Sequence, residues 1–285
     1  MNHLVATIVF GLAASLCWGS GDFSGGLASR RAHVASVVIA AYTIGLVFLV
    51  TLALIWREPF PSAANLLWGG LAGVAGVLGL LAFYSALATG KMGIAAPVSA
   101  VLTATLPVLF SAVTTGLPSL LQLGGFLLAL FAIGLISRPE RTAELARGSA
   151  SARALRLAVL AGCGFGCFFI LISRVSPDAT FWSLAAARFA SVAPLLLLTW
   201  LRRQPILPGM SVAPLVLITG ILDATGNAFF VLATHSGRLD VAAILSSLYP
   251  AATVLLAALV LRERVTRIQS IGIALALLAI PLISL

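Results

Sequence analysis

The charged residues of this chain are confined to short gaps between long apolar runs, and this spacing constrains the fold more than any other feature. Only 9% of the 285 residues are charged, whereas 61% are hydrophobic. A soluble domain carries about 25% charged residues, so this chain cannot cover a globule with polar side chains. A helix needs about 20 apolar residues to cross a bilayer. The sequence therefore predicts an all-α polytopic membrane protein surrounded by lipid.

Ten apolar runs are long enough to cross a bilayer, and helix-ending residues such as proline and arginine separate them. We expect transmembrane helices near residues 4–26, 34–56, 63–89, 93–116, 119–137, 154–173, 178–201, 211–235, 240–261 and 267–285. The only extended polar stretch covers residues 138–153 and is predicted to be a cytoplasmic linker. It separates a first five-helix repeat at 1–137 from a second at 154–285.

The second half of the chain resembles the first. A shift of 147 positions aligns residues 73–137 with 220–284 without a gap, and 21 of the 65 positions are identical. Shared polar and small residues, such as Gln122 with Gln269 and Gly125 with Gly272, weigh more than shared Leu or Ala. Five helices cross the membrane an odd number of times, so two tandem copies have opposite orientations. Inverted repeats are typical of secondary transporters that work by alternating access.

The positions of Lys and Arg predict how the chain is oriented. With the amino end outside, thirteen of the 17 Lys and Arg residues lie in inner loops. The outer loops hold only Arg57, Arg174 and Arg238. Because cytoplasmic loops are rich in Lys and Arg, we expect both termini on the non-cytoplasmic side of the cell (inner) membrane.

Motifs in the first, seventh and last two helices resemble those of a known family. The first helix reads GLAASLCWGSGDFSGGLASRR, and the seventh reads AAARFASVAPLLLL around Arg188. The closing pattern of a proline, a glutamate, a glutamine and a glycine falls at Pro250, Glu263, Gln269 and Gly272. These features resemble the EamA-type ten-helix transporters of the drug/metabolite transporter superfamily. The first half departs from the pattern, because Gly116 stands where Glu263 stands in the second. The resemblance implies an exporter of metabolites or amino acids.

Ionisable residues inside the predicted spans are the sharpest functional signal, because each costs about 2.5–3.5 kcal/mol to insert. Apart from residues within the first or last three positions of a span, there are three of them: Asp22, Arg188 and Asp223. At a helical rise of about 1.5 Å per residue, Arg188 lies roughly 15 Å and Asp223 roughly 18 Å below the outer surface. On the same basis, Asn227 lies at roughly 12 Å and Tyr249 at roughly 14 Å. These residues form either an ion pair that fixes helix packing or a substrate-binding and coupling site.

The charged cluster exists in only one repeat, which favours the functional interpretation. Positions 147 residues before the cluster carry no strongly polar side chain: Gly76, Leu80 and Leu102. Arg188 corresponds to Tyr42 at a slightly different offset. A purely structural requirement would more easily have stayed symmetric.

Asp22 follows Trp18 in the sequence Trp18-Gly19-Ser20-Gly21-Asp22 near the inner end of the first helix. It is either a helix-terminal or interfacial carboxylate, or a carboxylate that carries protons or binds a cation. With Asp223, it is our candidate for coupling transport to protons. Trp18 is either an interfacial anchor or a substrate-facing ring. Tyr42 and Tyr84 are candidates for lining the same cavity.

Four prolines fall inside predicted spans, where each frees a backbone carbonyl and acts as a hinge or a static kink: Pro97, Pro107, Pro194 and Pro250. The histidines are scattered at span ends, and nothing completes a metal site with Cys163 and Cys167, so no metal and no other cofactor is expected. The basic residues lie between membrane spans, so a nucleic-acid partner is not expected.

The leading hypothesis is a secondary transporter that exports a small metabolite of the amino-acid class, with protons as a possible coupling ion. The sequence contains no P-loop for ATP hydrolysis. A lipid or lipid-carrier flippase on the same scaffold is the first alternative. A membrane-embedded enzyme is less favoured, because it needs a cluster of catalytic or metal-binding residues near an interface, and we find none.

Overall fold

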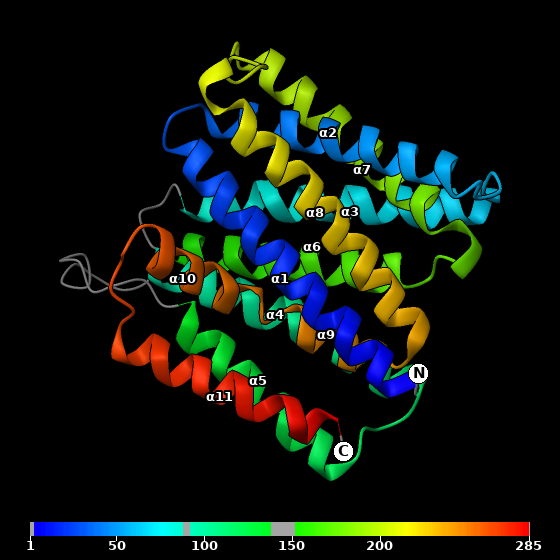
Figure 1. Ribbon diagram of the computed structural model, residues 1–285, viewed down its shortest axis with the longest axis vertical. Helices are drawn as coiled ribbons and strands as arrows, with labels where there is room; N and C mark the ends of the chain where they lie inside the picture. The colour runs from blue at the N-terminus through cyan, green and yellow to red at the C-terminus, as the bar shows by residue number, and fades with distance from the viewer. Residues whose placement is uncertain (1–2, 88–91, 138–151, 285) are drawn as a thin grey trace.

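The computed structural model of the chain is a bundle of membrane-length helices (Figure 1). It describes residues 3–87, 92–137 and 152–284. The first half contains α1 (His3–Ser29), α2 (Val34–Ile55), α3 (Ala63–Leu87), α4 (Met92–Thr114) and α5 (Leu120–Ile136). The second half contains α6 (Ala152–Ile172), α7 (Thr180–Leu201), α8 (Ala213–Ser236), α9 (Leu239–Ser246), α10 (Tyr249–Val260) and α11 (Arg267–Ile283). Short 3-10 turns precede α7 and α8, at Pro177–Ala179 and Met210–Val212.

The predicted spans are confirmed, with one difference in the ninth. Eight described segments are long and apolar enough to cross a membrane, and α5 and α11 are shorter apolar helices. The sequence predicts one continuous helix over 240–261, but the chain breaks at Ser247–Leu248 into α9 and α10. Pro250 explains the break, because it has no N–H to bond to the Ser246 carbonyl and is well tolerated in the first turn of a new helix.

The two halves begin their last helix with the same cap. Ser119 Oγ accepts a hydrogen bond from Gln122 N at 3.1 Å, and Gln122 Oε1 accepts one from Ser119 N at 3.2 Å. Thr266 and Gln269 form the same pair of bonds at 3.2 and 3.0 Å. Each capping box satisfies N–H groups that a helix start leaves unpaired. The sequence repeat is therefore a repeat of local structure.

Exchanging the two halves reproduces the main contacts between helices. α1 packs on α8 as α6 packs on α3, and α2 packs on α8 as α7 packs on α3. α1 meets both α9 and α10, as α6 meets α4. The pairs α2 with α7, α4 with α9 and α5 with α11 join equivalent helices. This pattern is that of a pseudo-two-fold axis, and the inverted repeats interlock along their whole length.

Glycines at equivalent positions allow this close packing. A Cβ added to Gly73 on α3 would overlap the carbonyl oxygen of Ala187 on α7. A Cβ added to Gly220 on α8 would overlap the carbonyl oxygen of Ala41 on α2. Small residues let membrane helices approach this closely. The two contacts also show that α2 and α7 are equivalent at an offset of 146 residues, one less than the rest of the repeat.

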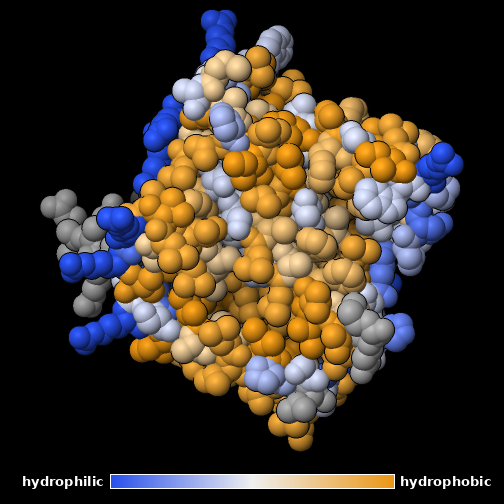
Figure 2. All heavy atoms as spheres, viewed as in Figure 1, coloured by the Kyte–Doolittle hydropathy of each residue, from blue (hydrophilic) through white to orange (hydrophobic). Residues whose placement is uncertain are grey.

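The surface is apolar around the middle and charged at two opposite ends. Figure 2 shows hydrophobic side chains over most of the visible face, with hydrophilic ones at its edges. Large apolar side chains such as Leu16, Val47 and Phe189 are exposed. A soluble protein rarely exposes such continuous apolar area, so this surface contacts lipid.

The bundle has two ends, which we call the terminal end and the linker end. At the terminal end α1 begins and α11 ends, and at the linker end α5 ends and α6 begins (Figure 1). Most described arginines outside the spans lie at the linker end, among them Arg30, Arg202 and Arg264. The predicted linker falls outside the described residues as far as position 151. That the linker end faces the cytoplasm stays a prediction.

Two adjacent glycines on α3 provide a test of the packing. A Cβ on Gly69 would overlap the Ser183 carbonyl oxygen, whereas nothing lies within 4 Å of a Cβ on Gly70. We expect Gly69→Ala to lower the free energy of unfolding by about 1–3 kcal/mol through overpacking. Gly70→Ala should leave it unchanged within about 1 kcal/mol or raise it. Unfolding in detergent micelles measures both, and equal effects of the two variants would contradict the packing of α3 on α7.

Candidate functional site

Arg188 is held near the middle of α7 with only 9% of its side chain exposed. One turn further along α7, Ser191 Oγ donates a hydrogen bond of 2.9 Å to the Gly73 carbonyl on α3. On α2, Gly45 lies beside the guanidinium, since a Cβ there would be in ordinary contact with Arg188 Nε at 3.7 Å. The contacts of α7 with α2 and α3 therefore fix the position of this charge.

The structure brings together three of the predicted site residues. Arg188 forms an ion pair with the carboxylate of Asp223 on α8. Its Cζ also lies over the ring of Tyr42 on α2, 4.3 Å from the centroid. The ring face and the carboxylate both stabilise the guanidinium where water is largely excluded. The side chain of Asp223 is 30% exposed, so the pair is open to solvent on one side.

Arg188 and Tyr42 lie on the pseudo-two-fold axis. They are equivalent residues of the two repeats at the offset of 146 that relates α2 to α7, and they touch each other. A residue can contact its own equivalent only where the axis passes between them. The ion pair therefore sits at the interface of the repeats, which is where inverted-repeat transporters bind substrate.

Asp22 faces the interior of the bundle and is nevertheless exposed. It lies one helical turn from Trp18, so the two side chains share a face of α1, opposite the lipid-facing Leu16. Trp18 is buried, whereas the side chain of Asp22 is exposed. Asp22 is also close enough to Asp223 for the two carboxylates to repel each other. The neighbouring Gly21 packs on the backbone of α8 at Asp223.

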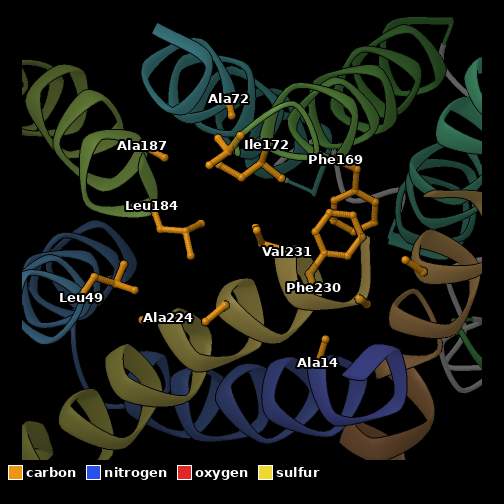
Figure 3. Close-up of a cluster of buried hydrophobic side chains, with 14 of the residues drawn as sticks. Ala14, Leu49, Ala72, Phe169, Ile172, Leu184, Ala187, Ala224, Phe230 and Val231 are labelled. Atoms are coloured by element: carbon orange, nitrogen blue, oxygen red, sulfur yellow. The ribbon is translucent and has the colours of Figure 1, made fainter. Parts of the chain in front are cut away.

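Trp18 belongs to an aromatic cluster inside the bundle. Its ring stacks on Phe169 of α6 at a centroid distance of 5.5 Å and meets Tyr249 of α10 edge-on at 6.4 Å. Phe230 of α8 lies 4.3 Å from Phe169 (Figure 3). Gly226 allows Trp18 to approach α8, since a Cβ there would lie 2.5 Å from the indole Cδ1. The position of Trp18 is therefore that of an interior ring and not of an interfacial anchor.

A continuous apolar core separates the ion pair from the terminal end. It extends from the aromatic cluster through Ile172, Leu184 and Val231 to Val175 and joins helices of both halves (Figure 3). Toward the linker end, smaller clusters of buried apolar residues lie around Val37 and around Ile39. A Cβ on Gly26, one turn beyond Asp22, would meet nothing within 4 Å. The apolar core thus closes the site toward the terminal end.

Two further predicted site residues take different places. Asn227 is buried, and its Nδ2 donates a hydrogen bond of 2.9 Å to the Asp223 carbonyl of its own helix. It therefore fixes the turn of α8 that carries Asp223. Tyr84 lies in α3, but its side chain is outside the described part of the chain.

The four candidate hinge prolines also differ from one another. Pro97 and Pro107 lie inside α4 and Pro194 inside α7, and neither helix is interrupted. Pro250 follows directly after the break between α9 and α10. Within the residues that the structure describes, no group of three His, Cys, Asp or Glu side chains could hold a metal ion.

Comparison with known proteins identifies the family. The profile of the EamA-like transporter family matches twice, at residues 5–138 and 152–285. The chain belongs to the EamA-like transporter family. This EamA protein is therefore a membrane transporter of the drug/metabolite transporter superfamily. No curated protein matches the sequence.

Solved structures support the fold of this EamA protein. One described as "Crystal structure of protein" is similar with a TM-score of 0.77 and 20% sequence identity. The match covers 98% of this chain and 96% of that chain. At this level of identity the likeness shows the shared fold alone.

The ion pair itself can be tested by stability measurements. We expect Arg188→Ala to lower the free energy of unfolding, because it leaves the Asp223 carboxylate without its partner. Breaking a fully buried pair costs about 3–5 kcal/mol, and the partial exposure of Asp223 reduces this. The double variant Arg188→Ala/Asp223→Ala should be less destabilised than the sum of the two single variants. Additive losses in this double-mutant cycle would show that the two side chains are not coupled.

Proposed function

We propose that this EamA protein is a secondary transporter that exports amino acids or closely related zwitterionic metabolites, with Arg188 and Asp223 as the substrate-binding pair. The observation that carries the proposal is the presence of one buried cation and one partly exposed anion, side by side, at the interface of the repeats. A zwitterion carries the complementary charges on adjacent atoms. Its carboxylate fits the Arg188 guanidinium, and its ammonium group fits the Asp223 carboxylate.

Electrostatics favours a zwitterion over an ion of either sign. The Arg188–Asp223 pair must open for either partner to bind a ligand. A ligand with one charge would leave the other partner unpaired in a poorly hydrated site, which is strongly unfavourable. A zwitterion satisfies both partners, and the planar guanidinium binds a carboxylate through two parallel hydrogen bonds. The Arg188–Asp223 pair is then neutral both with and without the zwitterion.

The rings beside the pair supply the apolar side of the site. Tyr42 lies directly under the guanidinium, and Tyr249 meets Trp18 on the face of α1 that also carries Asp22. Amphipathic ligands bind in clefts of this composition, with a few polar groups fixing their orientation. An uncharged side chain of the substrate would lie against these rings.

Asp22 is the residue that we propose for proton coupling. It is exposed in the interior, lies close to Asp223, and has no ion-pair partner among the described residues. Proton uptake by Asp22 removes the repulsion between the two carboxylates. A proton moving inward through Asp22 could then be exchanged for a substrate moving outward. If the linker end faces the cytoplasm, the side of the site away from the apolar core is the side from which an exporter loads.

Transport measurements test the substrate-binding pair. We expect Asp223→Asn and Arg188→Gln to lower kcat/KM for neutral amino acids in proteoliposomes at least about tenfold, because each variant leaves one end of the zwitterion unpaired. Thr43→Val is the matched control, because Thr43 follows Tyr42 on α2, is exposed, and bonds only to the Ile39 carbonyl of its own helix. Amino-acid amides and N-acetyl amino acids, which lack one charge, should compete at least about tenfold less well. Native rates in both site variants would show that the substrate binds elsewhere.

An imposed pH gradient tests the role of Asp22. We expect a gradient to drive amino-acid accumulation by the native protein, and Asp22→Asn to abolish that dependence while exchange of labelled for unlabelled substrate continues. Asp178→Asn is the control, since Asp178 lies in the exposed 3-10 turn before α7. If Asp22→Asn still responds to the gradient, another group carries the proton.

A further inference from the structure

Glu58 fastens the start of α7 at the terminal end. Its Oε1 accepts a hydrogen bond from Phe181 N at 3.0 Å, and its Oε2 accepts one from Trp182 N at 2.9 Å. Trp182 Nε1 in turn donates to the Glu58 carbonyl at 3.2 Å. Glu58 belongs to the α2–α3 loop of the first repeat, and α7 belongs to the second. A carboxylate at a helix N-terminus satisfies free N–H groups and interacts favourably with the helix dipole.

Further hydrogen bonds join the two halves at the same end. Asn65 on α3 bonds twice to Ser176 before α7, from Nδ2 to Oγ at 2.6 Å and from Ser176 N to Oδ1 at 3.1 Å. Arg238 before α9 donates from Nη2 to the Gly116 carbonyl after α4 at 2.8 Å. The polar contacts thus add to the apolar core in closing the terminal end.

The linker end contains the equivalent of Glu58. Arg57-Glu58-Pro59 after α2 corresponds to Arg203-Gln204-Pro205 after α7 at the offset of 146. Arg57 and Arg203 both have a φ of 51°. Glu58 N bonds to the Ala53 carbonyl at 2.9 Å, and Gln204 N bonds to the Thr199 carbonyl at 3.0 Å. The loops after α2 and α7 therefore end their helices with the same backbone turn. The residue after the arginine is a carboxylate, Glu58, in the first loop and an amide, Gln204, in the second.

The helix that Gln204 would fasten is uncapped in this structure. The equivalents of Phe181 and Trp182 are Ala35 and Ser36, in the first turn of α2. The residue before that turn, His33, makes no side-chain cap hydrogen bond. Ser36 Oγ instead bonds to the Pro205 carbonyl.

The other polar contact between the halves at the linker end is exposed. It is an ion pair of 3.4 Å between Arg30 and Glu263, whose side chains are 63% and 53% exposed. Exposed pairs of this kind stabilise little. The described residues therefore hold the linker end together less firmly than the terminal end.

We infer that Glu58 and Gln204 are the paired latches of a rocking gate. In the conformation seen here, Glu58 caps the start of α7, and the start of α2 has no side-chain cap. In the opposite conformation, Gln204 caps the Ala35 and Ser36 amides of α2, and Glu58 releases α7. Because a carboxylate binds helix N–H groups more strongly than an amide oxygen does, the unloaded protein rests closed at the terminal end. This inference rests on the alternating access of the proposed function and is independent of the substrate.

The test measures both ends of the protein in the same variants. Spin labels on Ala63→Cys and Asp178→Cys report the terminal end, and labels on Arg31→Cys and Gly209→Cys report the linker end. All four positions are exposed. The labels are introduced into full-length protein in lipid nanodiscs, after Cys17, Cys163 and Cys167 have been replaced by serine. Pulsed electron resonance then gives the distance distribution of each pair without substrate.

We expect Glu58→Gln to raise the ratio of long to short distances at the terminal end roughly tenfold above that of the native protein. At the linker end it should raise the ratio of short to long distances by the same factor. Loss of one charge-assisted hydrogen bond changes an equilibrium by about that factor. Gln204→Glu should shift both pairs in the same directions as Glu58→Gln. The double variant Glu58→Gln/Gln204→Glu, which only exchanges the two side chains, should rest closed at the linker end. Glu263→Gln is the control for removing a carboxylate at the linker end and should change neither ratio more than about twofold.

Two outcomes would overturn the gate. One is a loosening confined to the terminal-end pair in Glu58→Gln, which a merely structural cap would produce. The other is a Gln204→Glu variant that folds with native thermal stability and leaves both distributions unchanged. If the distances shift as stated in a protein that transports no amino acid, the gate is supported, and only the proposed substrate is contradicted.

Discussion

The burial of Arg188 is the constraint on which the rest of the site depends. A guanidinium cannot lose its proton under ordinary conditions, and a charge inside the bilayer is strongly unfavourable without a partner. Asp223 from α8 and the ring of Tyr42 from α2 supply the compensation. Three helices from both repeats must therefore meet at one point. That point lies on the pseudo-two-fold axis.

The position on the axis explains how a symmetric scaffold carries an asymmetric site. The capping boxes at Ser119 and Thr266 and the contacts of Gly73 and Gly220 are repeated in both halves. The charges are not repeated, since Gly76 occupies the position equivalent to Asp223. Two repeats of similar packing can exchange conformations at little cost in energy, while a site on the axis stays in place. The few unlike residues then decide what is bound and which end rests closed.

The spans could be predicted from the sequence because the bilayer forces each crossing to be a long apolar helix with its backbone bonds satisfied internally. The meeting of Arg188 with Asp223 could be anticipated from their similar depth. The aromatic cluster could not, because Phe169 and Phe230 look like any other apolar residue of a span. The cap formed by Glu58 on α7 joins residues more than 120 positions apart. Its only sequence signal is the pair of tripeptides Arg57-Glu58-Pro59 and Arg203-Gln204-Pro205.

By itself, the sequence determined that this protein crosses the membrane as ten helices in two inverted repeats, because apolar length and the odd number of spans leave little choice. It also restricted the charges inside the bilayer to Asp22, Arg188 and Asp223. Only the tertiary structure decided that Tyr42 shares the axis with Arg188, that Asp22 comes close to Asp223, and that an apolar core closes the terminal end. These properties depend on which side chains of distant helices face one another, and a single sequence does not encode that in any local pattern.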